Sequence, residues 1–595
     1  MSREIPKGCA FLTDEVCSER IFAPEDFTED QKMFAQTAAN FMQKEVMPRV
    51  EQLENKEFDE MVKVLRKSAE IGLTMIDIPE KYGGLEVDKT TSMIVTENMS
   101  TYSGWATTYG AHTGIGLWPL LYFGTEEQKQ KWLPKIGSAE VIAAYALTEP
   151  GSGSDALAAK TKAELTADEQ HFVLNGTKMW ITNAGFADLY TVFAQVEGDK
   201  FTAFLVEAER EGVNPGEEEE KLGLHGSSTR ELQLENVKVP VDNVLGEIGK
   251  GHKIAFNILN IGRFKLGVGS LGGAKHTLKL AAEYAQEREQ FGRPIAEFGA
   301  IRSKLAQMAS KLYGLEAMCY RVAGYMDRSL EVLDAEADDY PQQVMKAIEE
   351  FAVEDSIMKV VGSEVLDFVA DETLQIHGGM GYSAEYAAER IYRDVRINRI
   401  FEGTNEINRM LIPGMILKRT MKGELDLFDQ IQKVELALSE SQKPTPPPQE
   451  DDPEMAFEQF VTEQSKKLGV YCANQAIQKH MADLRERQEI LIDLADIISQ
   501  VYAMDSSVAR TRQLVDRDGL EATRVQRAAT KLVLAEGFET VRQRSERLLY
   551  NLADGEELNQ HLEAFEKLTF FPRIDVISLW EVVAEAVLER ARYPF

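Results

Sequence analysis

Cysteine is scarce in this chain of 595 residues: there are four, Cys9, Cys17, Cys319 and Cys472, and no two of them form a CxxC pair. Scattered thiols of this kind argue against a disulfide framework and a structural zinc site, and we expect no metal centre. No window approaches ~18 consecutive apolar residues, the length that a membrane-spanning helix needs. The first twenty residues lack the apolar region of a secretory signal and contain acids that transit peptides avoid. These absences predict a cytoplasmic protein with free thiols.

Basic residues are also under-represented. Lys and Arg total 66 against 98 Asp and Glu, which gives a formal net charge of −32. A surface this acidic repels nucleic acid and anionic membranes, so neither is expected as a partner. Total charge does not fix the local potential, and a basic pocket for an anionic ligand remains open.

The chain further lacks the strand–helix alternation and the GxGxxG turn of a dinucleotide-binding Rossmann domain. Helical periodicity is instead found on both sides of a region of short β-branched and aromatic runs. We predict a mainly α protein with a central β domain, in which NGT at 175–177 forms a hairpin tip. The predicted divisions are an N-terminal helical domain at 1–140, an antiparallel β domain at 141–250, a helical bundle at 251–424, a Pro-rich acidic linker at 425–454 and an additional helical domain at 455–595.

One carboxylate stands out in RIFEGTNEINR, residues 399–409. Glu402 lies between an apolar run and a Gly-Thr-Asn turn that begins a predicted helix. The simplest interpretation is a partly exposed acid beside a helix cap, with Thr404 or Asn405 as the cap. An acid–base group of an active site is the alternative, and the other motifs of the chain decide between the two.

Two further motifs lie about 25 residues apart in the predicted β domain. In AYALTEPGSGSD, residues 144–155, backbone N–H groups of a Gly-Ser turn can converge on a phosphate. A solvent-exposed turn is the competing interpretation. In MWITNAG, residues 179–185, Trp180 can pack against a flat aromatic ligand while Thr182 bonds its edge. A buried strand Trp is the alternative there.

With these motifs in place, the chain resembles the acyl-CoA dehydrogenase family over roughly residues 30–420. The helical extension at 455–595 is similar in kind to that of the very-long-chain subgroup. The resemblance implies the acyl-CoA dehydrogenase fold, FAD as cofactor, a fatty acyl-CoA substrate and α,β-dehydrogenation to the trans-2-enoyl-CoA. The segments that carry it are ALTEPGSGSD, KLGLHGSSTRELQLENVKVPVDNVLGE, NILNIGR, REQFGRPI, QIHGGMGYSAEYAAERIYRD and RIFEGTNEINR, in family order.

The resemblance also implies roles for individual residues, with Glu402 as the catalytic base. Arg288, Gln375, Gly378 and Gly379 are implied to reach the flavin of a partner subunit. The positions that match FAD contacts are Tyr145, Leu147, Thr148, Gly153, Ser154, Trp180, Ile181, Thr182, Arg288, Gln375, Gly378, Gly379, Thr404 and Glu406. The positions that match contacts to the CoA thioester arm are Ser154, Asn260, Arg263 and Gly403.

The implied chemistry explains a lone acid among apolar neighbours. Removing the proton next to a thioester carbonyl requires a base within ~3 Å and donors for the oxyanion that develops. The resemblance supplies the backbone N–H of Glu402 and a flavin ribityl hydroxyl as those donors. Some relatives carry the base just before the Arg that matches Arg263, but that position here is Gly262, which has no side chain to act.

Small residues also bear on substrate length. TTYGAHTGIG, residues 107–116, matches the segment that floors the acyl pocket of the family, and Gly110, Ala111 and Gly114 predict room for a long-chain tail. Close packing of helices is the alternative interpretation of these small residues.

The leading hypothesis is a long-chain acyl-CoA dehydrogenase of fatty acid β-oxidation that passes electrons to an electron-transfer flavoprotein. An acyl-CoA oxidase and a scaffold protein that retains the fold are the rivals. We expect the C-terminal extension to pack on the core and cap a homodimer. Membrane association is not expected, because the linker contains no basic amphipathic stretch.

Overall fold

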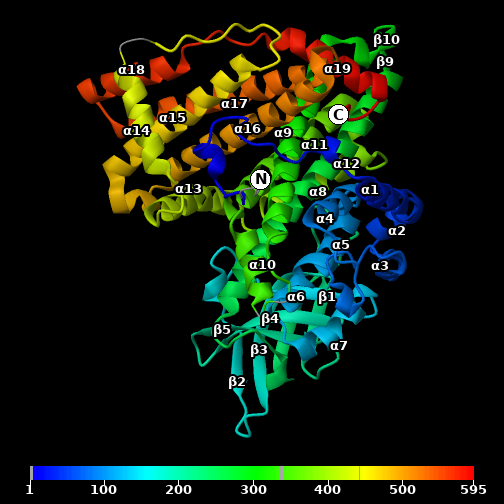
Figure 1. Ribbon diagram of the computed structural model, residues 1–595. Coiled ribbons are helices and arrows are strands. Elements are labelled where there is room, and N and C mark those ends of the chain that lie inside the picture. The colour runs from blue at the N-terminus through cyan, green and yellow to red at the C-terminus, as the bar shows by residue number, and fades with distance from the viewer. Residues whose placement is uncertain (1–4, 336, 338, 441–442) are drawn as a thin grey trace.

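A bundle of long helices forms the centre of this computed structural model, which describes residues 5–335, 337, 339–440 and 443–595 (Figure 1). In it, α8 and α11 lie side by side and α9 packs against both. Gly267 of α8 approaches Met358 of α11, and six residues further on Gly273 approaches Leu366, so the two helices run in the same direction. The bundle comprises α8 Gly251–Glu287, α9 Gly299–Leu330, α10 Tyr340–Glu349, α11 Ala352–His377, α12 Ala387–Val395 and α13 Asn405–Met421, with the short hairpin β9 Glu289–Gln290 and β10 Arg293–Pro294 after α8.

Shorter N-terminal helices cover one side of the bundle, as predicted (Figure 1). Thr28 and Thr125 each form a capping box with the Gln three residues later, which fixes where the first and the last of these helices begin. A π-helical segment, Ala111–Ile115, joins two of them. The helices are α1 Glu29–Phe41, α2 Val50–Glu54, α3 Phe58–Glu70, α4 Lys89–Asn98, α5 Ser103–Gly110, α6 Trp118–Phe123 and α7 Glu126–Gly137.

The β domain contains one eight-stranded sheet, in the order β6-β7-β3-β2-β4-β5-β8 with β1 beside β4. The sheet is mainly antiparallel, but β4 pairs parallel with both β1 and β2. Figure 1 shows the domain at the end of the molecule opposite the C-terminal helices. The strands are β1 Ala143–Ala146, β2 Lys162–Leu165, β3 His171–Thr182, β4 Leu189–Val196, β5 Lys200–Glu207, β6 Val213–Glu218, β7 Thr229–Pro240 and β8 Val244–Leu245.

The prediction of a hairpin tip at 175–177 is wrong. These residues lie inside β3, where the register with β7 shifts between Leu174 and Gly176. A Cβ on Gly176 would lie 2.4 Å from the Thr161 hydroxyl oxygen, so glycine serves close approach of a neighbouring segment here. The actual β2–β3 turn is closed by Thr166, whose backbone N–H donates to the His171 carbonyl at 2.8 Å.

The C-terminal helices share a hydrophobic core with the bundle. One cluster of buried side chains includes Leu271 and Leu312 of the bundle together with Leu494 and Val583 of the C-terminal helices. The predicted linker is shorter than expected, because residues 427–439 form a helix, and among the described residues the part without helix or strand spans 440 and 443–455. The helices are α14 Leu427–Ser439, α15 Ala456–His480, α16 Gln488–Ala522, α17 Arg524–Leu552, α18 Gly555–Thr569 and α19 Val576–Arg590.

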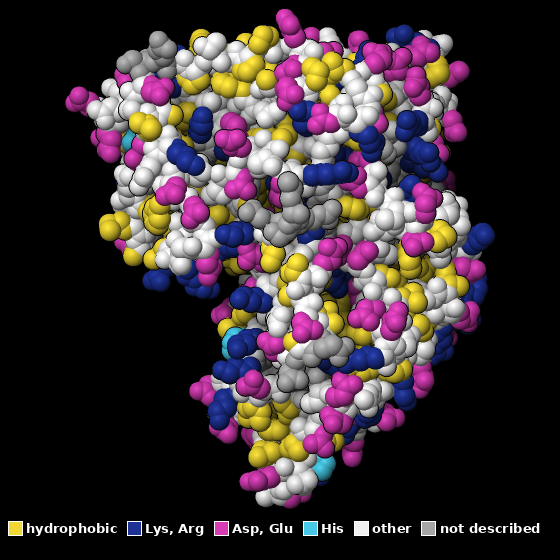
Figure 2. Space-filling model, viewed as in Figure 1, with side chains coloured by type: hydrophobic (Ala, Val, Ile, Leu, Met, Phe, Trp, Pro, Cys, Tyr) yellow, Lys and Arg dark blue, Asp and Glu magenta, His cyan; other side chains and the backbone are white. Residues whose placement is uncertain are grey.

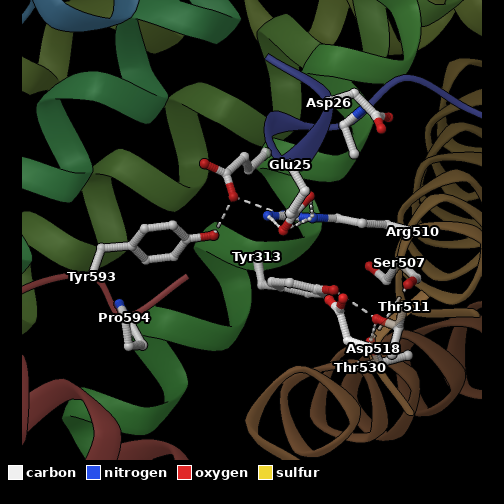
Figure 3. A network of polar contacts seen from close by, with 12 residues as sticks. Glu25, Asp26, Tyr313, Ser507, Arg510, Thr511, Asp518, Thr530, Tyr593 and Pro594 are labelled. Carbon is white, nitrogen blue, oxygen red and sulfur yellow. Dashed lines mark hydrogen bonds and ion pairs between the residues drawn. The ribbon is translucent and has the colours of Figure 1, made fainter. Parts of the chain in front are cut away.

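Buried charges reinforce this junction (Figure 3). Arg510 of α16 has a fully buried side chain and donates to Glu25 and to Glu316 of α9, at 2.7 Å in each case. Near the C-terminus the Tyr593 hydroxyl donates to the same Glu316 at 2.7 Å, and Lys275 of α8 completes the cluster. Five segments of the chain are therefore joined through the carboxylate of Glu316 and the guanidinium of Arg510.

The surface is predominantly acidic. Figure 2 shows acidic side chains spread over every part of the described face, interspersed with Lys and Arg. This distribution accords with the formal net charge of −32.

Arg510→Met should destabilise the protein by about 3–5 kcal/mol, because it leaves buried carboxylates without their counter-charge. Thermal unfolding of the purified protein measures the effect. Arg512→Met is the matched control: its partners Glu454 and Asp516 are 71% and 59% exposed, and such surface pairs contribute at most about 1 kcal/mol. Equal losses in the two variants would contradict a special role for the buried cluster.

Candidate active site

A cavity of about 180 Å³ lies between the N-terminal helices, α8 and the turn that precedes α13. Glu402 and Thr182 both line it, so the structure brings together the predicted base and a predicted flavin contact. The π-helical segment contributes Ala111 and Thr113, and such segments recur at functional sites. The remaining wall consists of Thr96, Met99, Ser100, Ser103, Ala106, Thr107, Tyr109, Gly110, Ile115, Trp118, Leu224, Gly262, Lys265, Leu266, Gly269, Ser270, Gly273, Leu366, Asn398 and Phe401.

Glu402 has an unusual backbone. Its φ is +56° and that of Gly403 is +79°, so two consecutive residues lie in the left-handed region. Thr404 caps α13 by accepting from the Ile407 N–H at 3.3 Å, which confirms one of the two predicted caps. A left-handed Glu is strained, and such strain persists where surrounding contacts hold it.

The Glu402 side chain lines the cavity. Its Oε2 atom has no hydrogen-bond partner among the described residues and almost no accessible surface. Burial raises the pKa of this carboxyl from 4.5 to about 7, although the positive charges of Arg263 and Lys359 lower it. The residue as a whole is partly exposed, as the simplest interpretation predicted. Its Oε2 atom is nevertheless buried, and a carboxyl with a pKa near 7 can exchange a proton near neutral pH, which favours the alternative of an acid–base group.

Gly262 lies directly against this carboxylate. A Cβ at that position would lie 2.7 Å from Glu402 Oε2. The alternative base position noted in the sequence thus faces the same point in space as Glu402. A larger side chain at this position would have to displace the end of the Glu402 side chain.

Arg263 and Asn260 form a unit beside the turn. Arg263 is 6% exposed and donates from Nε to the Glu402 carbonyl at 3.3 Å and from a terminal nitrogen to Asn260 Oδ1 at 2.9 Å. Burial lowers the pKa of the guanidinium, and the charge of Glu402 opposes that shift. The structure therefore brings Asn260, Arg263 and Gly403 together, as predicted, whereas Ser154 lies on an exposed turn of the β domain.

The two β-domain motifs lie side by side, because the Met179 N–H donates to the Thr148 carbonyl at 2.8 Å. Trp180 is 52% exposed and has φ +60°, so the alternative of a buried strand Trp is wrong. Tyr145, Leu147 and Ile181 are buried. Tyr145 has a hydroxyl without a partner among the described residues, and burial raises its pKa.

The Gly-Ser turn that follows is exposed at Gly153 and Ser154. The preceding residue Glu149 holds this turn in place. Glu149 accepts from Lys178 at 2.7 Å and from the backbone N–H of Lys160 at 2.6 Å. Lys178 is fully buried, and desolvation lowers its pKa to about 8 against the opposing effect of Glu149. A buried lysine in β3 gave no sequence signal, although it fixes the turn.

A second group of predicted residues lies at the other end of the bundle. Arg288 is 26 positions beyond Gly262, which corresponds to about 39 Å along α8. It is exposed, as are Gln375, Gly378 and Gly379 at the end of α11. Stacking of Tyr284 on His377, with ring centroids 4.0 Å apart, holds the two helix ends together. Within one chain these residues do not meet Glu402.

Thr404 and Glu406 lie at the start of α13, where Glu406 is exposed. Sequence reasoning missed two groups that hold the base turn, one from another helix and one from the end of the motif itself. Lys359 of α11 donates to the Gly403 carbonyl at 2.7 Å, and Asn408 of α13 donates to the same oxygen at 2.8 Å. Neither had a signal beyond a polar residue in a helix.

The floor of the cavity also differs from expectation. A Cβ on Gly114 would lie 3.4 Å from the ring of Trp118, so that indole fills the space beside Gly114. Gly110, in contrast, has no atom within 4 Å of a Cβ position. Gly110 and Ala111 line the cavity, whereas Gly114 does not.

Across the described ranges, no helix has the length and apolar character needed to cross a bilayer. The same ranges contain no group of three or more His, Cys, Asp or Glu side chains suited to a metal ion.

Family comparisons agree with this geometry. The models described as acyl-CoA dehydrogenase N-terminal, middle and C-terminal domains match residues 28–140, 144–237 and 249–416. A further model, also described as acyl-CoA dehydrogenase, C-terminal domain, matches residues 464–567. The four matched models, together with the helical fold, its inserted β sheet and the acid at the cavity, place this chain in the acyl-CoA dehydrogenase class.

Individual relatives support the same assignment. A probable acyl-CoA dehydrogenase of Bacillus subtilis (strain 168) is 45% identical, with 99% of both chains covered. The crystal structure of an acyl-CoA dehydrogenase complexed with FAD from Bacillus anthracis has a TM-score of 0.96 and 46% identity, and covers 99% of this chain and 100% of that one. The very long-chain specific acyl-CoA dehydrogenase of Bos taurus is 40% identical over 58% of this chain and 51% of its own length. The chain belongs to the acyl-CoA dehydrogenase family.

Glu402→Gln should stabilise the protein above pH 7 and leave stability unchanged below pH 4.5. Because the folded-state pKa is raised to about 7, the favourable contribution of the neutral acid is complete below the unfolded value and is lost as pH rises through 7. The gain at alkaline pH should approach about 3 kcal/mol. Melting temperatures across this range provide the measurement.

The control is Glu406→Gln. The pKa of this exposed carboxyl is lowered, first by its own backbone N–H, so its removal should cost stability above the unfolded pKa. A stabilisation by Glu402→Gln that does not change with pH would contradict the assigned protonation.

Proposed function

We propose that the protein is an FAD-dependent long-chain acyl-CoA dehydrogenase of fatty acid β-oxidation, with Glu402 as the base that removes the α-proton. The observation that carries this proposal is the buried Glu402 Oε2 atom, which has no partner among the described residues and belongs to a cavity that Thr182 also lines. A buried base with a pKa of about 7 suits abstraction from a carbon acid at neutral pH.

The residues present fit a flavin. Trp180 offers an exposed indole beside the cavity residue Thr182, and an indole packs well against a flat ring system. The buried Tyr145 hydroxyl lacks a partner among the described residues, and Cβ positions on Gly151 and Gly153 meet nothing within 4 Å. Open glycines and an unused hydroxyl are features of a cradle for a ligand. Leu147, Thr148 and Ile181 complete this side of the proposed site.

FAD, when bound, supplies a hydride acceptor for the substrate β-carbon. Glu402 holds the position from which the α-proton is taken, and its backbone N–H is proposed as a donor to the thioester oxygen. Arg263 and Asn260 orient the turn and border the proposed path of the thioester arm. Burial of the carboxylate raises its pKa to about 7 and so matches its basicity to the task.

The shape of the cavity supports a long tail. Gly262, Gly269 and Gly273 all line it from one face of α8, and their separation corresponds to roughly 16 Å of helix axis. A Cβ on Gly273 would meet Ser100 and Leu366 only at ordinary contact distances of 3.4 Å and more. The absence of side chains there extends the cavity away from Glu402.

Two protein partners are proposed. Arg288, Gln375, Gly378 and Gly379 are exposed and remote from Glu402, which favours a homodimer in which they contact the flavin of the second copy. Thr404 and Glu406 are proposed at the adenine end. Electrons are proposed to pass to an electron-transfer flavoprotein. Peroxide release under air would favour an oxidase instead, and acyl-CoA binding without flavin bleaching would favour a scaffold.

Glu402→Gln should keep bound flavin and acyl-CoA but bleach the flavin at least ~100-fold more slowly on anaerobic mixing, since the base is lost. Bleaching at the wild-type rate would overturn the base assignment. The matched variant is Gly262→Glu combined with Glu402→Gly. It directs a carboxylate at the same point from α8, and glycine suits φ +56°. Partial recovery of bleaching is expected.

Gly273→Leu should shift the chain-length preference toward shorter acyl-CoA. A filled far end should cost the longest substrates about 10-fold or more in kcat/KM and leave short ones unchanged. Anaerobic titration with acyl-CoAs of increasing length gives the profile. Gly414→Leu, at an exposed position of α13, is the control and should leave it unchanged. A uniform loss at every length in Gly273→Leu would argue against a tail in this part of the cavity.

A further inference from the structure

The carbonyl groups of the base turn are held by side chains from three helices. Arg263 of α8 donates to the Glu402 carbonyl, and Asn408 of α13 donates to the carbonyls of Gly403 and Thr404 at 2.8 and 3.1 Å. Lys359 of α11 donates to the Gly403 carbonyl at 2.7 Å. These bonds fix a left-handed backbone that the sequence of the turn alone does not favour.

Lys359 differs from the other two because it is both fully buried and charged. It is 0% exposed, and its second hydrogen bond goes to Asn405 Oδ1 at 2.8 Å. Asn405 is oriented in turn by Ser363 and Glu364, with distances of 3.1 and 3.0 Å. The ammonium is therefore aimed at the turn by a network and cannot rotate into solvent.

The electrostatic surroundings of Glu402 contain few other charges. Arg263 from α8 and Lys359 from α11 are the cations that act on it, and the Tyr145 hydroxyl of β1 faces it without a charge. Lys359 in turn is influenced by Glu402, Arg263, Glu406 and Glu364, while Arg263 is also near Asp355. Both cations donate a hydrogen bond to the base turn, Arg263 to the Glu402 carbonyl and Lys359 to the Gly403 carbonyl. Of the two, only Lys359 was absent from the predicted site residues.

We propose that Lys359 is a positioning residue of the base: it helps to fix the Glu402–Gly403 turn through the Gly403 carbonyl and, together with Arg263, supplies positive charge that favours the ionised Glu402 side chain. This inference rests on the proposed function, because it concerns the same acid. According to this inference, α11, a helix outside the catalytic motif, contributes to both the geometry and the charge state of the base.

Lys359→Gln, which is neutral, tests the proposal. Loss of a cation near a carboxylate disfavours the ionised form, so the rising limb of the pH profile for anaerobic flavin bleaching should move upward by about one pH unit or more. Because burial lowers the pKa of Lys359 to about 7, the two groups titrate together and the limb reports the pair. Lys359→Met provides a second neutral variant should the first fail to fold, and it should shift the limb in the same direction.

Three controls separate charge from support. Lys359→Arg keeps the charge and should retain the wild-type limb. Asn408→Leu removes an uncharged contact to the same carbonyl, and it should slow bleaching without moving the limb. Lys466→Gln removes another buried lysine, which pairs with Asp505 at 2.7 Å in the C-terminal helices, and should leave the limb in place.

A readout independent of turnover completes the test. Infrared difference spectra between each Lys359 variant and the same variant carrying Glu402→Gln report the protonated carboxyl of Glu402 as pH is varied. In the neutral Lys359 variants the proton should persist to higher pH than in wild type. Unchanged infrared and kinetic midpoints in those variants would overturn the inference. If none of the acyl-CoA substrates bleached the flavin of the wild-type protein, the proposed function would be overturned instead. The infrared titration would still test Lys359 in that case.

Discussion

Burial of one carboxylate is the constraint on which the site depends. Enclosing Glu402 disfavours its charged form, and two buried cations, Arg263 and Lys359, partly compensate. The outcome is an acid with a pKa of about 7, which is neither permanently ionised nor permanently neutral at physiological pH. A surface acid would be too weak a base for a carbon acid, and an uncompensated buried one would stay protonated.

The fold supplies this balance from separate elements. α8 presents Gly262 and Arg263 within one turn, so the same helix makes room for the acid and provides one counter-charge. α11, which runs alongside α8, provides the other. The β domain brings Thr182 to the cavity from a different part of the chain. The C-terminal helices contact α9 and are joined to it through Glu316 and Arg510, so this extension is an integral part of the structure.

Sequence reasoning succeeded where local chemistry determines the outcome. The helix cap at Thr404 follows from a side chain that accepts a backbone N–H group nearby in sequence. The sequence also indicated that Glu402 is present where Gly262 leaves the alternative base position without a side chain, because each residue belongs to a recognisable motif. The family resemblance placed the domains in order.

It failed where distant residues determine the outcome. The residues NGT at 175–177 have the composition of a turn, but Thr161 and β7 pack against them and keep them in a strand. The parallel pairing of β4 likewise has no local signal in the sequence. Trp118 closes the space beside Gly114 from the next helix. Lys359 and Lys178 are buried, whereas lysine is usually found at the surface. Each is stabilised by a hydrogen bond to a distant part of the chain, Lys359 to the Gly403 carbonyl and Lys178 to the Glu149 carboxylate.

The most direct test is a crystal structure of the flavin-loaded protein with a non-reducible acyl-CoA analogue. A Glu402 carboxylate oxygen should lie within ~3 Å of the analogue's α-carbon, on the face opposite the isoalloxazine ring. A carboxylate beyond that reach, or on the same face as the flavin, would contradict the account.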